Sequence, residues 1–117
     1  MSIFENFPRK EKLVVKSYEI DVSLYEKLEH ISNDLYDIHI SKLVNICIEQ
    51  LLISQKIIPY QRPKNEISVN RSFGIRESLY KGLTKLKREY GLSYNRLINI
   101  AIYNVLVDEG IIKVKKK

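Results

Sequence analysis

An internal repeat is the feature of this sequence that most restricts its fold. When the chain is aligned with itself so that Val14 matches Val69, VVKSYEI falls on VNRSFGI, and LYEKLEHI then falls on LYKGLTKL. After a small contraction that brings Leu43 onto Leu97, LVNICI matches LINIAI. Because both copies carry the same patterns in the same order, we expect them to form the same elements.

The hydrophobic period changes along each copy and predicts one strand followed by two helices. The first matched segment alternates with period 2, which is typical of a strand. The second has apolar residues spaced as on an amphipathic helix, beginning near residues 21–23 in one copy and 76–78 in the other. The third, residues 40–54 and 94–109, is apolar on most sides and is predicted to be a buried central helix.

Several residues predict where these helices begin and end. Ser23 with Glu26 is predicted to form a capping box at the first helix. Gly91 is suited to end a helix, Ser93 to cap the next one, and Gly110 to stop it.

Neither copy is large enough to bury a core alone, and a lone strand is unstable without a partner. We therefore expect a mainly α fold with a short antiparallel β-ribbon, backed on one face by four helices. Pairing within one chain would make a pseudo-dimer, and pairing between two chains is the alternative. The expected divisions are an N-terminal arm, a first unit, a linker, a second unit and a basic tail, at residues 1–11, 12–55, 56–65, 66–110 and 111–117.

The charge is concentrated in the second half of the chain. Residues 1–58 hold 7 basic and 9 acidic side chains, whereas residues 59–117 hold 13 and 5, within a net charge of +6. A local positive field favours a polyanion such as nucleic acid, although basic surfaces also serve solubility. No apolar run approaches the roughly 18 residues that span a bilayer, so we expect an intracellular protein without membrane contact.

The sequence offers little for catalysis or for a cofactor. It has no phosphate-loop glycine pattern, and no Ser-His-Asp or Cys-His arrangement that we can place. His30 and His39 lack a second ligand at metal spacing, so surface or capping roles are favoured. Cys47 aligns with Ala101, which predicts a small core residue. We expect neither an enzyme nor a bound cofactor or metal.

The order of alternating strand, amphipathic helix, turn and apolar helix resembles the ribbon-helix-helix family of DNA-binding regulators, the class of the Arc and methionine repressors. Here the pattern occurs twice in one chain, over about residues 12–55 and 66–110. The tandem repeat and the abundance of Ile, Lys and Tyr are also similar to small regulators of archaeal viruses, whose place of action would be the host cell.

The resemblance implies that the ribbon enters the DNA major groove and presents its outward side chains to base edges. The outward set is Val15, Ser17 and Glu19 in the first strand and Asn70, Ser72 and Gly74 in the second. Asn70 suits adenine, whereas Glu19 needs a cytosine amino group. An ordinary solvated strand face is the alternative for all six.

The resemblance also implies phosphate contacts at the start of the last helix of each copy. These positions are Ser93, Tyr94, Asn95 and Arg96, with Ser41 and Lys42 in the first copy, where the turn lacks a glycine and His39 stands at the cap. Lys16 and Arg71 occupy matching inward positions and are expected to reach phosphates, or else to cover apolar surface with their stems.

The leading hypothesis is a sequence-specific regulator of transcription that binds double-stranded DNA, with repression as the favoured effect, and that self-associates into dimers or arrays on DNA. A protein-interaction module similar to the antitoxins of this family is one alternative, and a non-specific architectural DNA binder is another. Asn45 and Asn99, inside the apolar helices, are expected to bond across the core. The lysine-rich tail either seeks phosphates, solubilises the chain or adds a strand.

Overall fold

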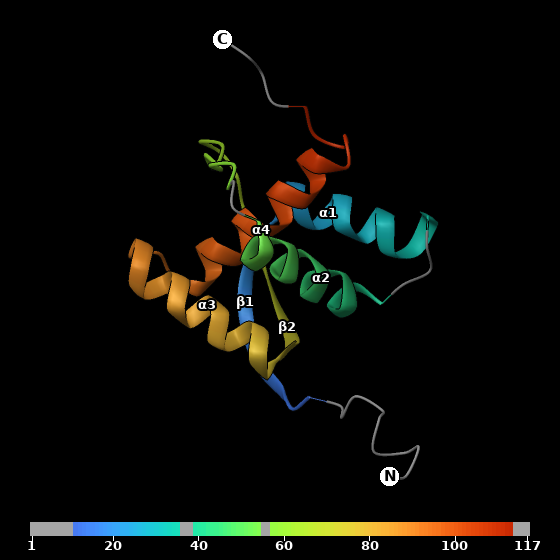
Figure 1. Ribbon diagram of the computed structural model, residues 1–117. Helices are drawn as coiled ribbons and strands as arrows, with labels where there is room; N and C mark the ends of the chain where they lie inside the picture. Colours follow the sequence, from blue (N-terminus) through green and yellow to red (C-terminus); the bar gives the residue numbers. More distant parts are fainter. Residues whose placement is uncertain (1–10, 36–38, 55–56, 114–117) are drawn as a thin grey trace.

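The computed structural model describes residues 11–35, 39–54 and 57–113. It confirms a mainly α fold with one short antiparallel sheet of two strands. The elements in chain order are β1 (Leu13–Asp21), α1 (Val22–His30), the π-helical turn η2 (Ile31–Leu35), α2 (Ile40–Ile53), β2 (Ser68–Arg76), α3 (Glu77–Tyr90) and α4 (Tyr94–Asp108). In Figure 1, α2 and α4 lie in the centre, with α3 and α1 on either side.

The two strands pair with each other inside the one chain. Their register runs from Leu13 opposite Arg76 to Asp21 opposite Ser68, and it places Ser17 opposite Ser72. Ser17 and Ser72 are equivalent in the repeat, and their hydroxyl oxygens lie 3.0 Å apart. The ribbon is therefore arranged with approximate two-fold symmetry about this pair.

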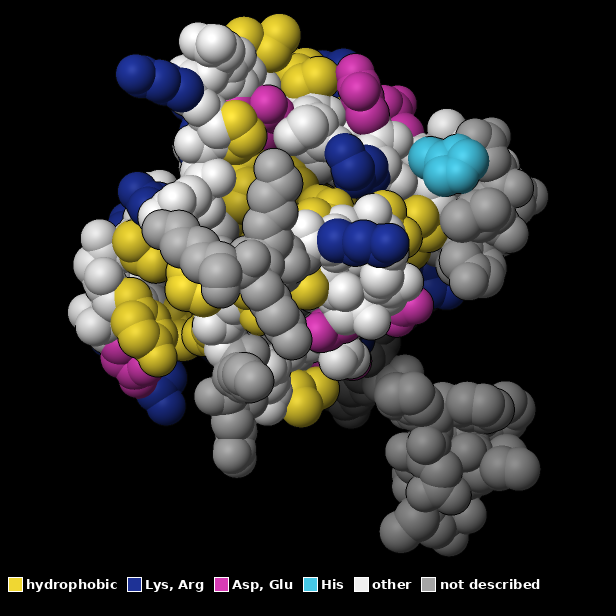
Figure 2. Space-filling view, turned by 90° about the horizontal axis from the view of Figure 1, so that it is seen from above, with side chains coloured by type: hydrophobic (Ala, Val, Ile, Leu, Met, Phe, Trp, Pro, Cys, Tyr) yellow, Lys and Arg dark blue, Asp and Glu magenta, His cyan; other side chains and the backbone are white. Residues whose placement is uncertain are grey.

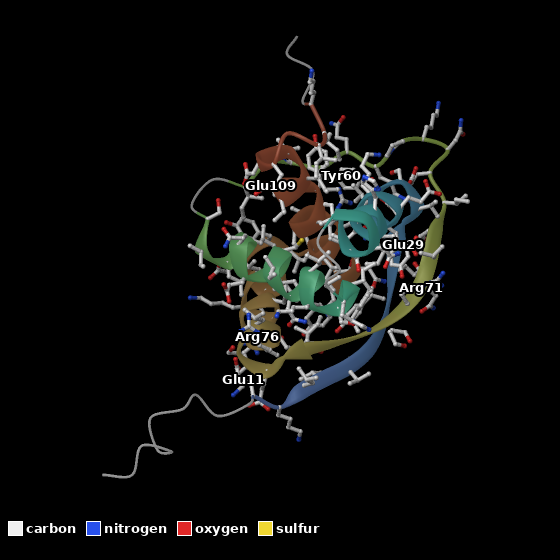
Figure 3. All side chains as sticks on the ribbon, turned by 90° about the vertical axis from the view of Figure 1, so that its right-hand side faces the viewer. Glu11, Glu29, Tyr60, Arg71, Arg76 and Glu109 are labelled. Atoms are coloured by element: carbon white, nitrogen blue, oxygen red, sulfur yellow. The ribbon has the colours of Figure 1, made fainter. Side chains whose placement is uncertain are left out.

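One face of the ribbon packs on the helices, and the other is exposed in the described part of the chain. Tyr18, Ile20, Phe73 and Ile75 point inward and are almost fully buried, which confirms the predicted alternation. The rings of Tyr18 and Phe73, equivalent in the repeat, stack with centroids 6.4 Å apart. In Figure 3 the ribbon curves along one side of the molecule with the helices on its inner side only.

The central helices α2 and α4 form the core, as predicted. Val44, Ile48, Ile98 and Ile102 are completely buried. Cys47 is also buried, and this burial raises the pKa of its thiol to about 12. The thiol thus occupies a core position, as does the equivalent Ala101.

Most of the predicted helix ends are confirmed. Gly91 ends α3 with a φ of 66°, a left-handed conformation that glycine adopts without strain. Ser93 accepts a hydrogen bond from the Arg96 N–H at 3.2 Å at the start of α4, and Gly110 follows its end with a φ of 74°. At α2, His39 Nδ1 accepts from the Ser41 N–H at 3.2 Å.

The predicted Ser23–Glu26 capping box is wrong. The N-cap of α1 is Asp21, and the Ser23 N–H donates instead to Glu66 Oε1 at 2.8 Å. Glu66 lies two residues before β2, so the first helix of one copy is capped from the other copy. A local sequence motif could not reveal this because the cap comes from 43 residues away.

The segment between the copies is docked on the end of the ribbon. Asn104 in α4 holds Ile58 at both its N–H and its carbonyl, at 2.6 and 2.8 Å. Asp21 accepts from the Tyr60 hydroxyl at 2.7 Å and from Arg62 Nε at 2.8 Å. Burial and the hydrogen bond to Asp21 raise the pKa of Tyr60.

Parts of the predicted organisation lie outside the described residues. These parts are the N-terminal arm up to residue 10, residues 36–38 of the first turn, residues 55–56 where the linker begins, and residues 114–117 of the tail. Residues 111–113 are described and belong to no strand. Among the described helices, none is long and apolar enough to cross a membrane.

Candidate nucleic-acid interface

The six residues predicted to read bases lie together on the outer face of the ribbon. The register pairs them across the two strands as Val15 with Gly74, Ser17 with Ser72, and Glu19 with Asn70. All are exposed except Gly74, which is half-buried beneath Leu13. The fold thus brings residues of both copies into one compact surface.

Lys16 and Arg71 hold equivalent positions on the two flanks of this surface. The Lys16 ammonium lies 5.1 Å from the centroid of the Tyr80 ring and donates to its hydroxyl at 2.9 Å. The Arg71 guanidinium lies 5.2 Å from the centroid of the Tyr25 ring, and Figure 3 shows Arg71 on the edge of β2 beside α1. Each cation therefore stacks on a tyrosine of the other copy and stays exposed.

The hydrogen bond to the Tyr80 hydroxyl raises the pKa of Lys16 further above its usual range. Lys16 is therefore cationic at neutral pH. Arg71 also donates to the Asn70 carbonyl at 2.9 Å, which fixes the direction of its side chain along the strand. Two oriented positive charges thus border the outer face, one on each side.

Three of the predicted phosphate contacts at the start of α4 make contacts within the protein. Ser93 caps the helix, and Asn95 Oδ1 accepts from the Glu19 N–H at 3.1 Å. The Tyr94 hydroxyl lies 2.7 Å from Thr84 Oγ1, and its ring stacks on Tyr80. These contacts join the start of α4 to β1 and α3.

The surroundings of Tyr94 differ from those of an ordinary tyrosine. Hydrogen bonds with Thr84 and Tyr80, together with the nearby ammonium groups of Lys87 and Lys16, lower its pKa. The Lys87 ammonium lies 4.5 Å from the centroid of the Tyr94 ring. Arg96 is exposed and has no hydrogen bond or ion pair from its guanidinium within the described ranges, so it is the available cation at this helix start.

The start of α2 is capped by a side chain like that of α4, with His39 in place of Ser93. The Ser41 N–H donates to His39 Nδ1, and the Ser41 carbonyl accepts from Asn45 Nδ2 at 2.8 Å, as the Asn95 carbonyl accepts from Asn99 Nδ2 at 2.7 Å. Lys42 is exposed. The first copy thus presents a lysine here, next to a helix start whose Ser41 amide is already bonded.

The buried asparagines Asn45 and Asn99 position the strands, and each one holds the strand of the other copy. Asn99 donates to the Glu19 carbonyl at 2.9 Å and accepts from the Asp21 N–H at 2.9 Å. Asn45 makes the equivalent bonds, donating to the Gly74 carbonyl at 2.9 Å and accepting from the Arg76 N–H at 2.9 Å. The prediction that both bond across the core is confirmed.

Sequence reasoning missed the acidic residues that cap the first helices. The Ser78 N–H donates to Glu11 Oε1 at 3.0 Å, which mirrors the bond from Ser23 to Glu66. Glu11 and Glu66 themselves occupy equivalent positions in the repeat, so extending the self-alignment toward the N-terminus was the signal that could have found them.

A polar pocket of about 260 Å³ opens beside one end of the ribbon. It is lined by Glu19, Asp21, Tyr60, Arg62, Ser68, Arg96 and Asn99. Here Arg62 is bonded to Asp21, whereas the side chains of Glu19 and Arg96 form no bond within the described residues. This end of the ribbon therefore carries charges of both signs.

A more apolar groove of about 470 Å³ adjoins this pocket and shares Tyr60 and Arg96 with it. It is lined mainly by Leu51, Ile57, Pro59, Leu86, Tyr90, Leu92, Leu97 and Ile100. In Figure 2, hydrophobic side chains gather on the left, which is the side on which α3 lies in Figure 1.

In the described part of the chain, no group of three His, Cys, Asp or Glu residues could hold a metal ion.

No family model, curated protein or solved structure matches this chain.

Proposed function

We propose that this protein is a DNA-binding transcriptional regulator of the ribbon-helix-helix type, whose two copies act as a pseudo-dimer. In this proposal the β1–β2 ribbon enters the major groove of double-stranded DNA and reads a specific sequence. Occupation of the site blocks transcription, so we favour a repressor.

The pseudo-dimer is supported by reciprocal contacts between the copies. The Val22 N–H donates to the Ile67 carbonyl at 2.9 Å, and the Glu77 N–H donates to the Lys12 carbonyl at the same distance. The buried asparagines and the capping glutamates repeat this exchange. Each copy thus completes the helix start and the strand of the other, as two subunits of a dimer would.

The observation that carries DNA binding is the free outer face of the ribbon. A two-stranded ribbon fits the major groove, which is about 12 Å wide, and side chains at alternate positions then meet base edges. Ser17, Ser72 and Asn70 offer hydrogen-bonding groups on this face. The opposite face is committed to the core, so the exposed side chains are held on a packed support.

Positive charge around the ribbon suits the DNA backbone. Lys16 and Arg71 border the outer face, and Arg96 and Lys42 stand exposed at the two central helix starts. If about six phosphates are contacted, the logarithm of affinity should fall against the logarithm of salt concentration with a slope near −5. A flat salt response would contradict the proposal.

The decisive variant is Asn70→Ala combined with Ser72→Ala. We expect it to weaken binding to a selected duplex, measured by mobility shift, while binding to random duplex changes little. The melting temperature should stay nearly unchanged because both side chains are exposed. An equal loss of folding, or undiminished specific binding, would argue against readout by this face.

The alternatives are distinguished by what the protein retains from a random duplex pool. Retention without a motif would favour an architectural binder. No retention, with a stoichiometric protein partner on purification, would favour an interaction module. Solution mass against the 13.8 kDa chain then tests whether pseudo-dimers self-associate with and without DNA.

A further inference from the structure

The outer face of the ribbon is chemically different at its two ends. One end carries apolar groups, and Arg76, which lies opposite Leu13 there, is paired with Glu49 of α2. The other end carries hydroxyl, carboxylate and amide groups. The equivalent positions, apolar end first, are Leu13 and Ser68, Val15 and Asn70, and Gly74 and Glu19. The central Ser17 and Ser72 are identical, so the two copies have diverged on either side of a shared centre.

At the apolar end, branched side chains stand in solvent. Leu13 is 53% exposed and Val15 is 66% exposed. A Cβ placed on Gly74 would lie 3.1 Å from Leu13 Cδ1, so the glycine lets Leu13 lie across the strand. These side chains can bond no base edge, but they can pack against the C5-methyl group of thymine in the major groove.

At the polar end, Glu19 and Asn70 face each other across the ribbon. Neither the Glu19 carboxylate nor the Asn70 amide has a partner in the described ranges, whereas the backbone of Glu19 is bonded at 3.1 and 2.9 Å to Asn95 and Asn99. The side chains are thus free on a fixed support.

The chemistry of this end limits which bases fit. A carboxylate only accepts hydrogen bonds, so guanine and thymine, which offer acceptors in the major groove, would repel it, while the cytosine amino group would bind it. The Asn70 amide can bond both the N6 amino group and N7 of adenine.

We infer that this protein recognises a non-palindromic DNA site, in which thymine methyl groups face Leu13 and Val15 while cytosine and adenine amino groups face Glu19 and Asn70. The inference rests on the proposed DNA binding. A ribbon of two identical strands presents the same side chains to both half-sites, so its target mirrors the two-fold symmetry of the protein. This ribbon joins unlike strands of one chain and presents a different set to each half-site.

The test is selection from a random duplex DNA pool with the full chain, Asn70→Ala and Val15→Asn. The second variant introduces at position 15 the residue that the other strand carries at position 70. The wild-type motif should have unlike halves. Asn70→Ala should lower the adenine preference about tenfold in one half only, and Val15→Asn should replace the thymine preference by adenine in the other half.

Two further variants serve as a control and as a replacement. Lys42→Ala should weaken retention of all duplexes without changing the motif, as expected for a phosphate contact. If Val15→Asn fails to melt cooperatively, Val15→Ser, which removes both methyl groups, should weaken the thymine preference in the same half. Retention of no duplex would overturn the proposed function together with this inference. A palindromic motif, or variants that alter both halves alike, would overturn this inference alone.

Discussion

The two copies agree closely where they hold each other and differ where they meet solvent or the linker. The four cross-copy bonds of Asn45 and Asn99 are all 2.9 Å long. The equivalent bonds to Glu66 and Glu11 measure 2.8 and 3.0 Å. The strand ends differ in charge, because Asp21 stands where the other copy has Arg76.

Asp21 and Arg76 make different contacts at the two ends of the ribbon. Asp21 is 4% exposed and bonds Tyr60 and Arg62 of the linker. Arg76 is half-buried and pairs with Glu49 of α2 at 2.7 Å. In Figure 3, Glu11 and Arg76 lie at one end of the ribbon and Tyr60 lies near the other. One copy has therefore been adapted to receive the chain connection.

The hydrogen-bonded framework of the ribbon and its outer surface are therefore under different structural constraints. A buried bond that both copies share must be kept in both, because losing it leaves strand amides or carbonyls unpaired. Outer residues have no such constraint and can differ between the copies.

The largest loss of stability is expected for Asn99→Ala and Asn45→Ala, which change equivalent residues of the two copies. Each removes the bonds that tie an α-helix to the other copy's strand and leaves strand groups unsatisfied. We expect each to lower the free energy of unfolding by about 2 to 3 kcal/mol in denaturant titration. The exposed Gln50→Ala in α2 is the control, with a change within about 0.5 kcal/mol. If one asparagine mattered and the other did not, the copies would not support each other equally.

The next prediction compares the stability lost when the end residue of each strand, Asp21 or Arg76, is replaced by alanine. Asp21→Ala should cost about 2 kcal/mol of unfolding free energy, because it removes a buried acceptor from Tyr60 and Arg62. Arg76→Ala should cost less than about 1 kcal/mol, because its pair with Glu49 is 39% and 42% exposed. Equal losses in thermal or denaturant unfolding would count against a special role for the linker end.

Tyr18→Phe should make the strands more alike and the protein more stable. The Tyr18 hydroxyl is buried with no hydrogen-bond partner in the described structure, and burial raises its pKa to about 12. Replacing it by the residue present at the equivalent Phe73 should raise the free energy of unfolding by about 1 kcal/mol. The reciprocal Phe73→Tyr should be destabilising, and a stabilising effect there would argue against this explanation.

The smallest effect concerns pH and the capping glutamates. Hydrogen bonds from Ser78 lower the pKa of Glu11, and those from Ser23 lower the pKa of Glu66, below the usual value of 4.5. Because the folded pKa is depressed, this stabilisation is present above pH 4.5 and is lost as the pH falls through the folded value.

Glu11→Gln and Glu66→Gln should therefore each flatten the loss of stability as the pH falls below 4.5, by similar amounts. Denaturant midpoints measured across this range provide the check, with the exposed Glu29→Gln in α1 as the control. Unchanged acid sensitivity in both capping variants would show that these caps do not depend on charge.

Much of the fold could be predicted because its signals are local and occur twice. The alternation around Tyr18 and Phe73, the apolar central helices, and the caps at Ser93 and Gly91 all follow from residues near in sequence. The cap of α1 could not be predicted in this way, because Glu66 reaches Ser23 only after the strands pair. The docking of Ile58 on Asn104 likewise joins residues that no periodic pattern relates.

For the candidate interface, the outward residues could be predicted from the sequence alone, because alternation along a strand fixes the face of each side chain. The presence of two equivalent strands could be predicted as well. The pairing of these strands within one chain, with Ser17 opposite Ser72, Glu19 opposite Asn70 and Val15 opposite Gly74, became visible in the folded chain alone. The register depends on long-range packing of Asn45 and Asn99 against the opposite strands, and such contacts exist only once the chain has closed on itself.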